Sequence, residues 1–410
     1  MSTTESYSDL HTPMDALKQA PTSLKLVLKR VRQIKYGQLT LHLPNGRSWT
    51  LKGEKQGPAG EATFREWNAF SRILSSGDIG LAEAFMAGEV DSPDLTEFLK
   101  VCSLNFDALQ NVAVGRTLTR WVNALRHRMF NRNSRNGSRK NILAHYDLGN
   151  TFYERWLDQT MTYSSALFAD DSMSLEQAQL EKYRRIARQI GARPGAHILE
   201  IGCGWGGFAE VAAGEFGAHV TSLTISDAQH AYASARMERQ GLSDLVDIRL
   251  QDYRDVQGRF DGVASIEMFE AVGEEYWPDY FDKIAEVLTE NGRAALQIIT
   301  IDDDLFAKYR KRADFIQRYV FPGGMLPSHE KLSEHTERSG LTIEDRHMFG
   351  RDYAKTLKIW AESFEAEWDK IRSEEFDERF HRLWRFYLSY CEAGFWTGRI
   401  DVGQFTLMRS

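Results

Sequence analysis

The stretch that decides the fold reads ILEIGCGWGGFA and covers residues 198–209. A short apolar run enters a turn rich in glycine, and a segment with helical spacing follows it. Glycines at the junction of a strand and a helix let backbone amides approach a ligand at the N-terminus of that helix. The spacing is GxGxGG, and an acid, Glu200, lies directly before the turn rather than about 20 residues after it. The pattern therefore favours S-adenosylmethionine over a dinucleotide as the ligand.

From this turn onward, the chain alternates between strand and helix patterns. Strand-like runs lie at 196–205, 219–226, 246–253, 260–269 and 293–301, and helical patterns lie at 206–217, 227–241 and 276–292. Such alternation predicts an α/β fold with a parallel, doubly wound sheet.

Polar residues follow the second and third predicted strands. Thr224 and Gln229 follow the second strand, and Asp252 and Tyr253 follow the third. Ligands bind outside the carboxyl ends of parallel strands, so these residues are candidates for cofactor contacts. Taken singly, such residues are also explained as helix caps or as turn residues with a local hydrogen bond.

The composition is that of a globular protein with more than one domain. The chain has 410 residues, of which 42% are apolar and 27% are charged, and one ordinary core does not organise that length. No apolar run reaches the roughly 18 residues that span a bilayer, and we see no signal-peptide pattern. The three cysteines are far apart. We therefore expect a reduced, cytoplasmic protein without disulfides and without a metal site.

The net charge of -7 hides an uneven distribution. Residues 1–140 hold 20 Lys and Arg against 13 Asp and Glu, whereas the rest of the chain holds 31 against 45. Residues 23–35 predict a basic amphipathic helix, residues 38–51 a hairpin, and residues 64–109 several short helices. A basic front part on an acidic body indicates a surface for phosphates, either of nucleic acid or of lipid headgroups.

We expect the chain to divide into three segments. Residues 1–130 would form a small α+β domain, residues 131–141 a polar linker, and residues 142–410 the α/β domain. Between Asp107 and Asp147 the sequence has no acid. The basic residues of that stretch are Arg116, Arg120, Arg126, Arg128, Arg132, Arg135, Arg139 and Lys140.

Motifs along most of the chain resemble those of the cyclopropane-fatty-acyl-phospholipid synthases, which are S-adenosylmethionine-dependent methyltransferases acting on double bonds of phospholipid acyl chains. The matching stretches are GLAEAFMAGEVDSPDL (80–95), AHYDLGNTFYERWLD (144–158), MTYSSALF (161–168), ILEIGCGWGGFA (198–209), LTISDAQ (223–229), LQDYRD (250–255), SIEMFEAVG (265–273), YVFPGGMLPS (319–328) and GRDYAKTL (350–357). A generic methyltransferase would match only the glycine turn. The resemblance implies a Rossmann-like class I methyltransferase fold with a mostly parallel seven-stranded sheet, and a smaller N-terminal domain that associates with lipid.

The same resemblance implies the residues that contact S-adenosylmethionine. They are Tyr146, Tyr163, Ser164, Gly202, Cys203, Gly204, Thr224, Gln229, Asp252 and Tyr253. Gln229 can pair with ribose hydroxyls, and Asp252 can accept from the adenine amino group. The rings of Tyr146 and Tyr163 can attract a sulfonium by cation–π contact, although tyrosines of this kind are also typical of a core.

The resemblance implies the chemistry as well. Attack of the double bond on the methyl group gives a carbocation, and the position of the base decides whether a cyclopropane or a methyl branch beside a shifted double bond results. In the family a bound bicarbonate is that base, held by a cysteine, a glutamate, a histidine, a backbone amide and a tyrosine. The corresponding positions in this chain are Ser165, Glu270, Gln297, Ile299 and Tyr353.

This chain departs from the family pattern around the base. Ser165 stands in place of the cysteine, Gln297 in place of the histidine, and Ala271 in place of the histidine that usually follows the glutamate. Glutamine can donate to an anion but cannot carry a positive charge or relay a proton, so bicarbonate binding should weaken. We predict methyl transfer to a cis double bond without obligatory ring closure. A glutamine-held bicarbonate with cyclopropane formation is the alternative.

The expected partner is an unsaturated phospholipid in an anionic membrane surface, reached by reversible docking on the inner face. The resemblance also suggests a homodimer. Residues 302–328 begin acidic and end in Pro-Gly-Gly, which indicates a lid over the site or, alternatively, a surface excursion. Two other functions stay open, a non-catalytic lipid-binding protein and an RNA methyltransferase. We expect no nucleic-acid partner, because the basic stretch has few aromatic residues and the α/β part is acidic.

Overall fold

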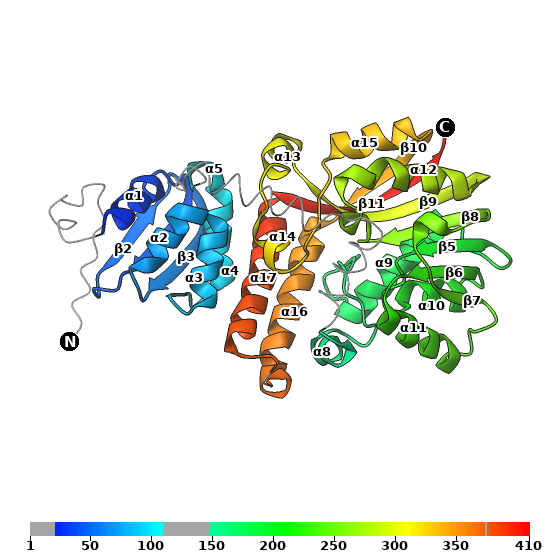
Figure 1. Ribbon diagram of the computed structural model, residues 1–410, viewed down its shortest axis with the longest axis horizontal. Coiled ribbons are helices and arrows are strands. Elements are labelled where there is room, and N and C mark those ends of the chain that lie inside the picture. The colour runs from blue at the N-terminus through cyan, green and yellow to red at the C-terminus, as the bar shows by residue number, and fades with distance from the viewer. Residues whose placement is uncertain (1–20, 110–147, 374) are drawn as a thin grey trace. The chain divides into compact units, whose positions relative to one another are not determined.

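The computed structural model describes residues 21–109, 148–373 and 375–410. Within it the chain forms two compact units. Unit 1 comprises Met1–Arg126 and Trp368–Arg399, and unit 2 comprises His127–Glu367 and Ile400–Ser410. Figure 1 shows that each unit contains a sheet with helices packed on it.

Unit 2 is built on a seven-stranded sheet in the order β10-β11-β9-β8-β5-β6-β7 (Figure 1). Its strands are β5 (His197–Ile201), β6 (His219–Thr224), β7 (Val246–Leu250), β8 (Phe260–Ile266), β9 (Leu288–Ile301), β10 (Leu341–Met348) and β11 (Ile400–Arg409). Strands β5 to β9 pair parallel, and β11 pairs antiparallel with both of its neighbours. The predicted mostly parallel seven-stranded α/β sheet is confirmed.

Both faces of this sheet are covered, because neighbouring residues of one strand enter two different cores. Ile198 of β5 packs with Phe208 and Val220, whereas Leu199 packs with Trp277 on the other side. The helices of unit 2 are α8 (Asn150–Trp156), α9 (Leu175–Gln189), α10 (Gly207–Gly214), α11 (Asp227–Arg239), α12 (Trp277–Val287), α13 (Asp303–Tyr309), α14 (Phe315–Tyr319), α15 (His329–Arg338) and most of α16 (Gly350–Ile371). Burial on both sides explains why the strands read as continuous apolar runs.

Unit 1 contains a four-stranded sheet in the order β2-β1-β3-β4. Its strands are β1 (Tyr36–His42), β2 (Ser48–Lys52), β3 (Lys55–Phe64) and β4 (Val90–Asp91), and its helices are α1 (Thr22–Val31), α2 (Asn68–Ser76), α3 (Asp78–Met86), α4 (Leu95–Leu104), α5 (Phe106–Leu109) and α17 (Glu378–Thr397). The predicted hairpin corresponds to β1 and β2. Strand β3 was not predicted, because its glycines resemble a turn. Gly60 is needed there, since a Cβ would lie 2.7 Å from Phe98 Cα.

The basic helix α1 buries its apolar side within unit 1. Leu24 is fully buried, and Val27 and Leu28 are nearly so, while Lys25 and Lys29 are exposed between them. The hydrophobic stripe therefore stabilises the unit itself, and the exposed face of the helix carries positive charge.

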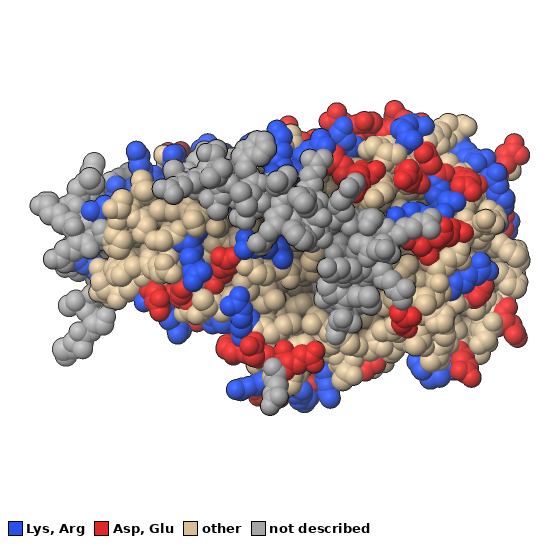
Figure 2. All heavy atoms as spheres, viewed as in Figure 1, with Lys and Arg blue, Asp and Glu red and all other residues tan. Residues whose placement is uncertain are grey.

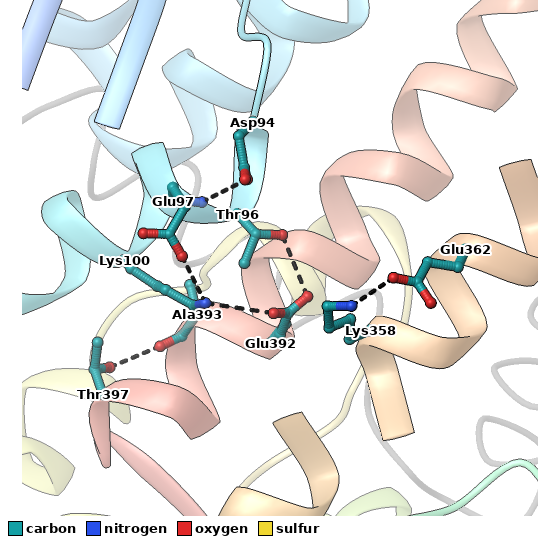
Figure 3. A network of polar contacts seen from close by, with 9 residues as sticks. All are labelled: Asp94, Thr96, Glu97, Lys100, Lys358, Glu362, Glu392, Ala393 and Thr397. Carbon is teal, nitrogen blue, oxygen red and sulfur yellow. Dashed lines mark hydrogen bonds and ion pairs between the residues drawn. The ribbon is translucent and has the colours of Figure 1, made fainter. Parts of the chain in front are cut away.

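The prediction of one continuous domain over residues 142–410 was wrong for the segment that contains α17. Figure 3 shows Lys100 of α4 beside Glu392 of α17, with Nζ 3.5 Å from the carboxylate and 2.9 Å from that of Glu97. Arg382 of α17 donates to the carbonyl oxygens of Phe85 and Val90 at 2.5 and 2.7 Å. A late helix completes an early domain, and no local sequence pattern reports such a long-range pairing. The predicted linker, residues 131–141, lies outside the described residues.

No helix among the described residues is long and apolar enough to cross a bilayer. On the face of unit 2 seen in Figure 2, lysines and arginines are interspersed with acidic side chains.

Candidate active site

The glycine turn between β5 and α10 has the backbone that its sequence requires. Gly202 and Gly204 have φ values of 91° and 49°, in the left-handed region that favours glycine. The amides of Gly202 and Cys203 donate to the Leu223 carbonyl at 3.0 and 2.8 Å, which ties the turn to β6. A Cβ on Gly204 would meet no atom within 4 Å. Open space therefore lies beside the turn, as a ligand at this helix N-terminus needs.

Glu200, the acid before the turn, is buried in β5. Its carboxyl group accepts a hydrogen bond from Ser222 of β6. Burial raises the pKa of Glu200 to about 8, against the lowering effect of Ser222 and Arg236. The acid is thus held by the neighbouring strand at the base of the turn.

The residues predicted at the ends of β6 and β7 lie at the same edge of the sheet. Thr224 Oγ1 donates to Gln229 Oε1 at 2.9 Å. Asp252 accepts from Arg254 through both oxygens, with Nε at 2.9 Å and a terminal nitrogen at 2.6 Å. Tyr253 packs against Tyr280 with ring centroids 5.4 Å apart. Asp252 therefore carries an ion pair that the sequence reasoning did not include.

Aromatic rings of unit 2 surround Tyr163. Its centroid lies 5.3 Å from that of Tyr153, 5.7 Å from Trp156 and 5.4 Å from Trp360. Trp205, in the glycine turn, lies 5.0 Å from Tyr153. The cluster joins the glycine turn to α16, and aromatic ring faces of this kind attract cations. Tyr146, the other predicted tyrosine, lies outside the described residues.

The residues predicted to hold an anion meet around a residue that the sequence reasoning missed. Glu267 Oε1 accepts from the Ser165 amide and from Gln297 Nε2, each at 2.8 Å. Glu267 Oε2 accepts from the Tyr353 hydroxyl at 2.7 Å. The stretch SIEMFEAVG contains two glutamates three residues apart, and that pair at the end of a strand was the available signal.

The second glutamate, Glu270, lies beside the first. Its Oε1 accepts from the Ile299 amide at 2.6 Å, and its buried Oε2 has no hydrogen-bond partner among the described residues. Removal from water and the nearby Glu267 carboxylate raise the pKa of Glu270 to about 8. Glu267 accepts three hydrogen bonds and Glu270 accepts one, so the donors of the site favour the negative charge on Glu267 over Glu270.

Ser165 contributes to this site through its main chain. Its hydroxyl donates to the Ala166 carbonyl at 3.0 Å, and only its backbone amide contacts Glu267. The short serine side chain hydrogen-bonds to the adjacent backbone carbonyl. The backbone amide of Ser165 therefore makes the contact with the Glu267 carboxylate.

A buried lysine interacts electrostatically with Glu267. Lys182 of α9 is fully buried, and its Nζ donates to Ser164 Oγ and to Gln179 Oε1, each at 2.7 Å. Burial lowers the pKa of Lys182 to about 7, while attraction to Glu267 and Asp158 opposes that shift. Burial also raises the pKa of Glu267, against attraction to Lys182 and the three hydrogen bonds that it accepts.

The amide of Gln297 is held in one orientation by the neighbouring strand. Its Oε1 accepts from Gln404 Nε2 of β11 at 3.1 Å, and Gln404 Oε1 accepts from Arg185 at 2.8 Å. The amino group of Gln297 is therefore the part that faces Glu267.

The segment 302–328 is attached next to Glu270. The Met325 amide donates to the Glu270 carbonyl at 2.8 Å. The Tyr309 hydroxyl accepts from Gln317 Nε2 at 3.2 Å and from the Leu326 amide at 3.3 Å. These bonds fold the segment back on itself beside the two glutamates.

Comparison with known proteins bears on this site. A family model described as mycolic acid cyclopropane synthetase matches residues 133–405. The tuberculostearic acid methyltransferase of Mycobacterium tuberculosis is 40% identical over 349 residues, which are 82% of this chain and 80% of that protein. The cyclopropane-fatty-acyl-phospholipid synthase of Escherichia coli is 36% identical over 347 residues, with 83% and 85% covered.

Solved structures agree with these sequence matches. The cyclopropane synthase MmaA2 from Mycobacterium tuberculosis has a TM-score of 0.61 and 31% identity, with 66% of this chain and 97% of that chain covered. The mycolic acid cyclopropane synthase CmaA1, solved in complex with SAH and CTAB, has a TM-score of 0.61 and 30% identity, with 66% and 98% covered.

Proposed function

Because this chain belongs to the mycolic acid cyclopropane synthetase family of S-adenosylmethionine-dependent fatty acyl methyltransferases, we propose that it methylates a cis double bond in an acyl chain of a membrane phospholipid. The product would be a methyl-branched unsaturated chain. The observation that carries this proposal is the anion site around Glu267, where Gln297 and the Ser165 amide stand in place of the family's histidine and cysteine.

The cofactor end of the site suits methyl transfer. S-adenosylmethionine, when bound, would supply an electrophilic methyl group to the double bond, with S-adenosylhomocysteine as the leaving group. The rings of Tyr153, Tyr163 and Trp360 would stabilise the sulfonium and keep water away from the double bond.

The acyl carbocation that results must lose a proton, and the chain's own groups decide which one. Loss from the new methyl group closes a ring, and loss from a flanking chain carbon forms a double bond beside a methyl branch. Gln297 can donate a hydrogen bond but cannot shuttle a proton. The rigid contacts of Gln297 with Glu267 and Gln404 therefore favour one fixed base position.

Unit 1 and the basic stretch at residues 116–140 would supply the contact with the membrane. Lys25, Lys29, Arg32 and Lys35 are exposed in or next to α1, and eight more basic residues lie between positions 116 and 140. We expect these charges to bind anionic headgroups on the inner face, and not nucleic acid. Replacing Arg126, Arg128, Arg132 and Arg135 with alanine should lower vesicle binding at low salt, and unchanged binding would count against this role. The homodimer stays a prediction.

The test of the reaction uses vesicles of cis-unsaturated phospholipid and S-adenosylmethionine labelled in its methyl group. A branched unsaturated chain and a cyclopropane have the same mass, so the esters are analysed before and after mild hydrogenation, which adds two hydrogens only to the former. We expect the labelled product to take up hydrogen. An exclusively cyclopropane product would overturn the branched assignment, and cofactor binding without transfer to any lipid would favour a non-catalytic lipid-binding protein.

A further inference from the structure

The donors that the family uses to hold bicarbonate are already occupied by two carboxyl groups of this chain. The Ser165 amide, Gln297 and Tyr353 donate to Glu267. The Ile299 amide donates to Glu270. Gln297, Ile299 and Tyr353 correspond to bicarbonate ligands of the family. In this chain each of them donates a hydrogen bond to a glutamate instead.

A glutamate carboxylate and a bicarbonate ion share a planar pair of oxygens and one negative charge. We propose that the Glu267 carboxylate takes the place of bicarbonate and accepts the proton lost from the acyl carbocation, so that the enzyme works without added carbonate. This inference rests on the proposed function.

Charge also opposes a separate anion at this position. Two carboxyl groups lie side by side, and the buried Oε2 of Glu270 has no hydrogen-bond partner among the described residues. A bicarbonate placed here would add a further negative charge to a poorly solvated pair, which is costly. The buried Lys182 can supply at most one positive charge to this cluster.

The backbone at Glu267 is consistent with a specialised residue. Its φ is 50°, in the left-handed region, where a residue with a Cβ is strained relative to glycine. The Glu267 amide donates to the Gln297 carbonyl at 2.8 Å, which fixes the strained residue to β9. Backbone strain of this kind occurs most often at residues that act in a functional site.

The proton step balances with the groups present. The C–H bond of a carbon next to the cation breaks, its electron pair forms the new double bond, and the proton binds a Glu267 oxygen. Glu267 then releases that proton to water when the product leaves. No further oxidant, reductant or ion is required.

Two variants of Glu267 separate this role from a structural one. Glu267→Gln keeps the size of the side chain but removes the carboxylate, and Glu267→Gly suits the positive φ and opens the position to a small anion. Glu290→Gln serves as the control, because Glu290 is exposed on β9, the strand that also carries Gln297. Thermal melting checks that every variant is folded.

The assay measures methyl transfer to anionic, cis-unsaturated phospholipid vesicles in carbonate-free buffer, with and without added bicarbonate or formate. We expect the wild-type rate to be unaffected by bicarbonate. Glu267→Gln should lose about 100-fold or more and not be rescued, whereas Glu267→Gly should lose as much and be restored by either anion. A wild type that requires bicarbonate, or an active Glu267→Gln, would overturn the inference.

A binding measurement decides the anion position without reference to activity. NMR of ¹³C-bicarbonate should show binding to Glu267→Gly and none to the wild type, and binding to both would overturn the inference. If the wild type methylates no acyl chain, the proposed function fails while this measurement still tests the anion site. If it forms only cyclopropane without bicarbonate, the product assignment fails and the role of Glu267 stands.

Discussion

The hydroxyl of Tyr353, in the first turn of α16, donates a 2.7 Å hydrogen bond to Glu267, which directly follows β8. The two residues are 86 positions apart in the sequence. Tyr353 is buried, so its hydroxyl sets both the orientation and the charge of the carboxylate. This contact couples α16, the helix that follows β10, to the proposed base.

We predict that Tyr353→Phe slows methyl transfer by about 10-fold to 100-fold, because a hydrogen bond to a charged group is worth roughly 1.5–3 kcal/mol. Cofactor affinity should stay unchanged, as measured by titration with S-adenosylhomocysteine. Tyr36→Phe in unit 1 is the matched control, since the Tyr36 hydroxyl accepts a hydrogen bond from the exposed Lys55. A variant of full activity would contradict the role of the Tyr353 hydroxyl.

Replacing Lys182 with methionine should move the acidic limb of the pH–rate profile to higher pH. The lysine attracts the Glu267 carboxylate and holds its pKa down. Without that cation, the carboxylate binds a proton more tightly and is available as a base only at higher pH. The profile of kcat against pH tests this, with Lys331→Met on the surface as the control. Superimposable acidic limbs would rule out the coupling.

Glu270 should make the protein less stable as pH rises. Its folded pKa of about 8 lies above the ordinary value of 4.5, so the folded state holds a proton that the unfolded state has lost. Its contribution is fully present below about pH 4.5 and disappears as pH rises through about 8. Glu200, with a pKa also raised to about 8, acts in the same direction.

Between about pH 5 and 7, the unfolding free energy of the wild type should fall more steeply with rising pH than that of Glu270→Gln. We predict a difference between the two slopes of about 1.4 kcal/mol per pH unit. In that window Lys182 adds little, because its own pKa of about 7 and its ordinary value of 10.5 lie at or above the upper limit. Urea unfolding at several pH values provides the measurement, and Glu290→Gln provides the control. Parallel slopes for wild type and Glu270→Gln would contradict the prediction.

The ion pair that attaches α17 to unit 1 should contribute strongly to stability. The side chains of Lys100 and Glu392 are only 9% and 8% exposed, so Lys100→Met leaves a buried carboxylate unpaired, at a cost of about 3 kcal/mol. Lys358→Met is the control, because the Lys358–Glu362 pair is 62% and 64% exposed and is worth at most about 0.5 kcal/mol. Figure 3 shows both pairs. Equal losses of unfolding free energy in Lys100→Met and Lys358→Met, measured by urea unfolding, would contradict this prediction.

The sheet and the glycine turn could be predicted because their signals are local. The run from Ile198 to Ile201 is apolar throughout since both faces of β5 are buried, and the glycines after it mark positive φ. Gln297, Ile299 and Tyr353 were assigned through the family resemblance, and the structure brings them to the two glutamates. The end of α12 was predicted less accurately, because residues 288–292 begin β9 and do not continue the helix.

The sequence by itself determined the alternation of strands and helices, the glycine turn and the family, because each of these depends on neighbouring residues. Only the tertiary structure decided that α17 completes unit 1, and that Glu267 accepts hydrogen bonds from Ser165, Gln297 and Tyr353. Hydrogen bonds and buried charges depend on distance in space. Residues more than 80 positions apart become partners only when β8, β9 and α16 are packed together.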